Sequence, residues 1–231
     1  MTEGVQDRSR LTAVGGLTGA VAGLALLAIV ALYSFIVPLQ FEPAANLLRN
    51  LTSSQSQTFF KFVFWALAIV ELLTIPAFIG LYRLLRTRHP GLSLSGVVTA
   101  IVSSAMYSVS LIIYATTLPE LAAAYASVAD QDLLRAIEFQ ASAFDALAVG
   151  IASVASLLLG LSLVLWSRAM SRELSRYGLP TLLIGVFSLV TVLSLALGQM
   201  LVWLILLTLE GIWLVTVGVK MAMLSELQAA M

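Results

Sequence analysis

The sequence has no cysteine, one histidine and few charged residues, which make up 10% of the chain. Without cysteine there are no disulfide bonds, thiolate metal sites or cysteine nucleophiles. A lone His89 cannot supply a paired-histidine haem site or a histidine-rich zinc site. No lysine lies deep in an apolar run, and no glycine-rich phosphate loop is present. We therefore expect no metal, no cofactor and no catalytic residue, and an enzyme is the less favoured class without being excluded.

Charge of either sign is also scarce, since 12 basic and 12 acidic residues give a formal net charge of zero. The basic residues are scattered, so the chain lacks the extended basic surface that binds nucleic acid. What the chain has in abundance is apolar sequence, at 60% of all residues. This usage lies outside that of soluble domains and predicts an integral membrane protein whose partner is the lipid bilayer.

Apolar runs of about 20 residues are long enough to cross about 30 Å of hydrocarbon as a helix. The stretch after Pro180 is about two crossings long and is interrupted near Gly198 and Gln199, which indicates a tight turn. We expect an all-α, polytopic bundle of six transmembrane helices in a single domain, residues 1–231. The expected spans are 11–37, 59–85, 94–118, 141–166, 181–198 and 201–222.

The orientation of the spans follows from the basic residues near their ends. Arg49, Lys61 and Arg135 fall on one side of the membrane. The majority falls on the other side and consists of Arg8, Arg10, Arg83, Arg86, Arg88, Arg168, Arg172, Arg176 and Lys220. Both termini are therefore predicted to be cytoplasmic. On the outer side, either Asp130 or Asp132 is placed to cap a helix that continues into the fourth span.

Small residues at four-residue spacing mark two spans for close helix packing. The first span carries Gly15, Gly19 and Gly23, and the fourth carries Gly150 at the end of a similar row. We expect these two helices to be central and tightly packed. Such a row serves either internal packing or a homo-oligomer interface, and both alternatives stay open.

Three acids interrupt the apolar runs, and an acid inside a membrane indicates a functional site by default. Glu71 lies about 18 Å of helix from Arg83, and Glu210 about 15 Å from Lys220, which places both near the bilayer midplane. Asp145 lies about 35 Å from Arg168, near the outer boundary. We expect Glu71 and Glu210 to face a shared polar cavity, with Asp145 at an outward-facing mouth.

The surroundings of Glu71 strengthen this interpretation. Pro76 cannot donate to the carbonyl of Leu72, which leaves a free acceptor about one turn from the acid, and Thr74 lies on nearly the same face. Together these groups could hold a proton, a water or a cation. The structural alternative for each acid is a neutral carboxyl that donates one hydrogen bond to a neighbouring helix.

Several local sequences resemble a family of bacterial six-span membrane proteins, catalogued as domain of unknown function 4386. The likeness covers roughly residues 9 to 222. It rests on the glycine-rich first span after a short basic N-terminus, Leu81-Tyr82-Arg83-Leu84-Leu85-Arg86, Phe144-Asp145, and Arg176-Tyr177-Gly178-Leu179-Pro180. The resemblance implies a six-helix protein of the inner membrane and supplies no substrate or catalytic residue.

Two functions of different classes follow from these features. The first is binding or passage of a small solute, cation or proton at a midplane site containing Glu71 and Glu210, with Thr74 and Asp145 as further candidates. The second is a scaffold or accessory subunit without catalytic activity that packs through its glycine rows. A lipid-modifying enzyme ranks third, because no base is placed to activate a serine.

Overall fold

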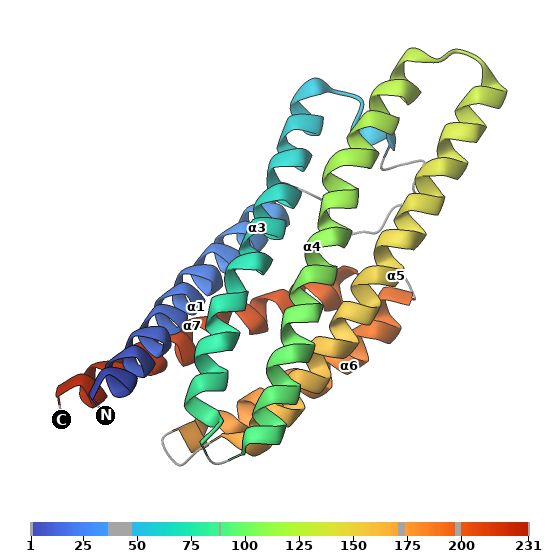
Figure 1. Cartoon of the computed structure of the whole chain (residues 1–231). Helices are drawn as coiled ribbons and strands as arrows, with labels where there is room; N and C mark the ends of the chain where they lie inside the picture. The colour runs from blue at the N-terminus through green and yellow to red at the C-terminus, as the bar shows by residue number, and fades with distance from the viewer. Residues whose placement is uncertain (1, 37–47, 88, 171–173, 197–199, 231) are drawn as a thin grey trace.

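The computed structural model describes residues 2–36, 48–87, 89–170, 174–196 and 200–230, with side chains for 10–33, 48–87, 89–170, 174–195 and 201–226. Six long helices account for most of the described chain (Figure 1). They are α1 (Thr2–Ile36), α3 (Ser54–Leu85), α4 (Pro90–Ser127), α5 (Gln131–Ala169), α6 (Ser175–Ala196) and α7 (Met200–Ala230). Each contains a stretch long and apolar enough to cross a membrane. The prediction of an all-α protein with six transmembrane helices is confirmed.

The helices extend beyond the predicted spans, most clearly at the turn between α4 and α5. These two have 38 and 39 residues, or about 57 Å each, which exceeds the hydrocarbon thickness of about 30 Å. Asp130 begins α5 as its N-cap, because its carboxylate accepts hydrogen bonds from the backbone N–H groups of Asp132 and Leu133. Of the two predicted caps, Asp130 is therefore the one used. Positions 37 and 197–198 of the predicted spans lie outside the described residues.

The six helices form a closed ring, in which each packs mainly against two others. The order around the ring is α1, α3, α4, α5, α6 and α7, and α7 returns to α1. Both ends of the chain lie at one end of the bundle, together with the α3–α4 turn (Figure 1). Arg83, Arg168 and Arg176 belong to helix ends on that same side. The side chains of Arg8, Arg88 and Arg172 lie outside those described.

Glycines allow α1 to approach both of its neighbours closely. A Cβ atom on Gly23 would lie 2.5 Å from the carbonyl oxygen of Gly211 on α7, and one on Gly15 would lie 2.7 Å from that of Pro76 on α3. A Cβ atom on Gly19 would lie 3.0 Å from the Cβ atom of Ala77 on α3. The glycine row of α1 therefore packs against helices of its own chain.

Gly150 on α5 behaves differently, because a Cβ atom there would meet no atom within 4 Å. Close approach on α5 occurs instead at Gly160, where a Cβ would lie 2.8 Å from the carbonyl oxygen of Gly185 on α6. The internal-packing alternative therefore does not apply to Gly150. The expectation that the first and fourth spans are central is wrong, because a ring of helices has no central member.

Hydroxyl groups along α4 join it to the helices on either side. Ser108 donates to the carbonyl of Ala68 on α3, at 3.1 Å. On the opposite side, Ser103 donates to Ala155 at 2.8 Å and Ser110 to Ala148 at 2.9 Å, both on α5. Interhelical hydrogen bonds are one of the forces that hold helices together in lipid. The serines of α4 therefore fix its position in the ring.

Candidate functional site

Two carboxylic acids from different helices lie together inside the ring. Glu71 of α3 and Glu210 of α7 are each 3% exposed. Their charges interact electrostatically, although α3 and α7 make only slight contact with each other. Phe64, Glu71 and Phe78 recur at seven-residue spacing, which places them on one face of α3, and all three are buried. The apolar pattern that turns Phe64 and Phe78 inward therefore turns Glu71 inward as well.

Three further polar side chains surround the two acids. Tyr107 of α4 interacts electrostatically with both, and more strongly with Glu210 than with Glu71. Its hydroxyl forms a short hydrogen bond with the hydroxyl of Ser156 on α5. The indole of Trp203 on α7 lies near the same phenol. We call these five residues, which come from four helices, the acid site.

The acid site contains a buried polar atom that lacks a partner. Glu210 Oε2 is buried and has no hydrogen-bond partner among the described residues, and the buried Trp203 Nε1 interacts with the Tyr107 phenol without forming a regular hydrogen bond. Within the same part of the chain, the ion pairs are Arg49–Glu138 and Arg135–Asp132, so neither Glu71 nor Glu210 is paired with a basic residue. Two carboxyl groups that interact in a desolvated place cannot both carry full charge at low cost.

Thr74 lies beside the acid site but is already engaged. Its hydroxyl hydrogen-bonds with Ser104 Oγ of α4 at 2.9 Å and donates to the carbonyl oxygen of Glu71 at 2.6 Å. Pro76 has no N–H to pair with the carbonyl of Leu72. The side chain of Leu72 is exposed, so Leu72 lies on another face of α3 from the buried Glu71. Thr74 therefore links α3 to α4, and the predicted grouping of a carboxyl, a hydroxyl and a freed carbonyl is not brought together on one face.

Asp145 lies at a different level of the bundle. The hydroxyl of Tyr114 on α4 donates to Asp145 Oδ1 at 2.6 Å. Asp145 is eleven residues, or about 16 Å of helix, from Ser156 in the direction of the α4–α5 turn. The structure therefore brings Glu71 and Glu210 together and leaves Asp145 apart, with a tyrosine partner of its own.

Aromatic contacts lie along the bundle on both sides of the acid site. Toward the α4–α5 turn, the ring of Phe64 lies 5.2 Å from that of Tyr114 and 4.4 Å from that of Phe60. Toward the chain termini, Trp166 packs against Phe78 at 5.3 Å and stacks on Trp213 at 6.4 Å. The two acids therefore lie between two aromatic layers along the bundle.

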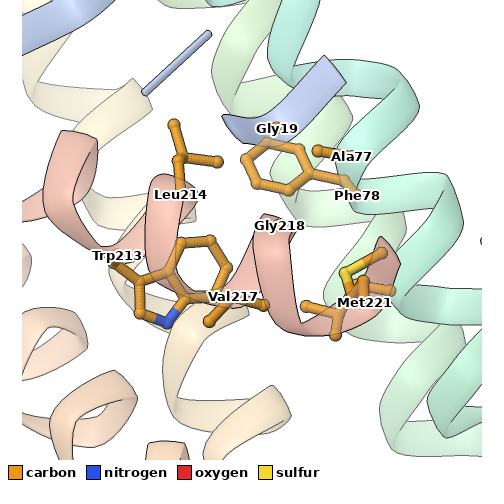
Figure 2. A pocket seen from close by; sticks show the side chains of 9 residues that line it. Gly19, Ala77, Phe78, Trp213, Leu214, Val217, Gly218 and Met221 are labelled. Carbon is orange, nitrogen blue, oxygen red and sulfur yellow. The ribbon is translucent and has the colours of Figure 1, made fainter. Parts of the chain in front are cut away.

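A small apolar cavity adjoins the second aromatic layer, between α1, α3 and α7. Figure 2 shows Phe78 and Ala77 on one side of it and residues of α7 on the other, with Gly19 close by. Its volume is about 10 Å³, close to the minimum that one water molecule needs. Its lining is wholly apolar, so it differs from the shared polar cavity that the sequence predicted.

A separate polar cluster joins the residues before α3 to the α4–α5 hairpin. Tyr125 donates to Glu138 at 3.0 Å and accepts from Arg49 Nε at 3.4 Å. Hydrogen bonding and electrostatic interaction with Tyr125 raise the pKa of Arg49, and Glu138 adds to this effect. Arg49 is charged at any physiological pH. The cluster has a structural role, because it connects the residues before α3 to the α4–α5 hairpin.

One family model matches most of this chain. The family model described as Domain of unknown function (DUF4386) matches residues 21–219, which is most of the chain. The chain belongs to the DUF4386 family. Neither the curated proteins nor the solved structures contain a match to it. The matched region of this DUF4386 protein includes all five residues of the acid site and Asp145.

Sequence reasoning missed two residues of the acid site in this DUF4386 protein. Tyr107 and Ser156 are ordinary in an apolar span, and nothing local distinguishes them from neighbouring serines and tyrosines. Trp203 lies seven residues before Glu210, on the same face of α7. This spacing places Trp203 two turns from Glu210 in the sequence itself, whereas Tyr107 and Ser156 require the packing of α4 against α5.

Proposed function

We propose that this protein binds a small cation at the acid site and passes it across the membrane. The observation that carries the proposal is the buried Glu71–Glu210 pair, which has no basic partner among the described residues. Burying an acid in a membrane is costly, and retaining two at one level is difficult to explain by packing alone. A site that takes up positive charge removes that cost whenever it is occupied.

The two aromatic layers support passage by alternate opening rather than through a permanent pore. Phe64 and Tyr114 pack together toward the α4–α5 turn from the pair, and Phe78, Trp166 and Trp213 pack together toward the chain termini. A bound cation could therefore leave only after one layer separates. The half-buried Asp145, which holds the hydroxyl of Tyr114, is placed to act at the outer layer. With both termini in the cytoplasm of a bacterial cell, that layer faces outward.

The experiment is a flux assay on the full chain in liposomes, with dyes that report protons or alkali cations inside. We expect the wild type to dissipate an imposed gradient and Glu71→Gln to fall to the rate of empty liposomes. Glu120→Gln is the matched control, because Glu120 is an exposed acid of α4. Equal rates for the wild type and Glu71→Gln, or no flux of any cation, would refute the proposal.

The alternative function, a membrane scaffold, is favoured by one observation. The α1 glycines are occupied within the chain, whereas Gly150 is open to its surroundings along an exposed row with Ser142 and Ala146. Rows of small residues support helix association in lipid. Self-association that Gly150→Leu abolishes, combined with an absence of flux, would favour this function over transport.

A further inference from the structure

Three backbone oxygens at or beside residues of the acid site already accept two hydrogen bonds each. Each helical carbonyl there accepts the N–H four residues on, and it also accepts a hydroxyl from another side chain. The three carbonyls and their donors are Glu71 with Thr74 at 2.6 Å, Ala155 with Ser103 at 2.8 Å, and Ser156 with Ser188 at 2.8 Å. Since a carbonyl oxygen has two lone pairs, none of these three has one left for a metal ion.

The remaining groups of the acid site suit a metal ion poorly. Ca²⁺ takes about six to eight oxygen ligands and Mg²⁺ requires octahedral geometry. Among the described residues, no group of three or more acidic, histidine or cysteine side chains is arranged to hold a metal. Trp203 contributes an indole N–H, which can only donate and so offers a metal ion no ligand atom. The hydroxyls of Tyr107 and Ser156 share one hydrogen bond.

The same groups suit a proton, which needs no shell of oxygen ligands. Two interacting carboxyl groups without a cation are most stable when one proton lies between them, leaving a single negative charge. If Ser156 donates to Tyr107, the phenol O–H is free to donate toward Glu210, the acid with which it interacts more strongly. The Trp203 N–H, which lies near the Tyr107 phenol, is a second donor close by. Donors stabilise a carboxylate and oppose a metal ion at the same point.

Building on the proposed function, we infer that the cation bound at the acid site is a proton, held by Glu71 and Glu210 as a pair. The resting pair carries one proton and one negative charge. Uptake of a second proton from water forms an O–H bond on the remaining carboxylate and makes the pair neutral. Release returns that proton to water and restores the charge. Tyr107 and Trp203 act as positioning residues that stabilise the charged form.

The test is infrared spectroscopy of the full chain in lipid nanodiscs, which detects the C=O stretch of a buried protonated carboxyl. NaCl, KCl, MgCl₂ and CaCl₂ are titrated at fixed pH, with choline chloride holding the ionic strength constant. We expect the wild type to show the band, and no salt to diminish it. The double variant Glu71→Gln/Glu210→Gln should lose the band, whereas Glu120→Gln should keep it. Tyr107→Phe should shift its frequency, because the hydroxyl that interacts electrostatically with both acids is lost.

The outcomes separate this inference from the proposed function. Loss of the wild-type band on addition of one metal cation would overturn the proton assignment and leave cation binding in place. Absence of the band from the wild type, or its persistence in the double variant, would show that the pair holds no proton and overturn the inference whatever the flux assay gives. The salt titration needs only the wild type, so the inference remains testable if the double variant fails to fold.

Discussion

Replacement of Gly23 by alanine tests the packing that holds α7, and with it Glu210, in the ring. The new Cβ would lie 2.5 Å from the carbonyl oxygen of Gly211 and 2.8 Å from the backbone nitrogen of Val215. Both atoms belong to the backbone, so the two helices must separate by about 0.5 Å or more to relieve the contact. Overpacking of this kind costs about 1–3 kcal/mol, and the gain in helix propensity of about 0.5–1 kcal/mol offsets only part of it.

The assay is reversible unfolding in mixed micelles of increasing SDS content, followed by tryptophan fluorescence. Gly150→Ala is the matched control, because its Cβ would meet no atom within 4 Å. We expect Gly23→Ala to lower the free energy of unfolding by about 1–2 kcal/mol, and Gly150→Ala to leave it unchanged or raise it by up to about 1 kcal/mol. A Gly150 variant that is at least as destabilised as the Gly23 variant would refute the reasoning.

Three further results are expected. Tyr114→Phe removes the hydrogen bond to Asp145 and should lower the free energy of unfolding in the same assay by about 0.6 kcal/mol, and by no more than about 1.7. Asp130→Ala removes the N-cap of α5 and should cost about 1 kcal/mol, which Asp130→Asn should largely restore. Ser54→Cys, the only thiol in the chain, should react with an impermeant reagent added outside intact cells; labelling only after lysis would reverse the proposed orientation.

The elements of the fold could be predicted from the sequence because each is a local property. A membrane-spanning helix requires only an apolar run of sufficient length, and all six runs were recognisable. The Asp130 cap was one of two predicted from the residue type and its place before a helix. The distances along the helices from Glu71 to Arg83 and from Glu210 to Lys220 could also be worked out, because the rise of a helix per residue is fixed. These quantities do not depend on how the helices are arranged.

The ring order could not be predicted, because it depends on which faces meet. The glycine row of α1 indicated close packing, and its partners proved to be α7 and α3. The row ending at Gly150 gave the same local pattern, and yet a Cβ atom on Gly150 would meet no atom within 4 Å. A small residue permits close approach without requiring it, so the two rows are indistinguishable until the neighbouring helices are placed.

The composition of the acid site depends on the register between α4 and α5. Tyr107 is paired with Ser156, and Tyr114 with Asp145. A slip of one helical turn, about 5.4 Å, would break both hydrogen bonds at once. The serines of α4 that donate to carbonyls of α5 would lose their partners in the same movement. The row of hydroxyls therefore places a tyrosine beside the acid pair, and because this placement depends on many bonds along two helices, no short motif could have revealed it.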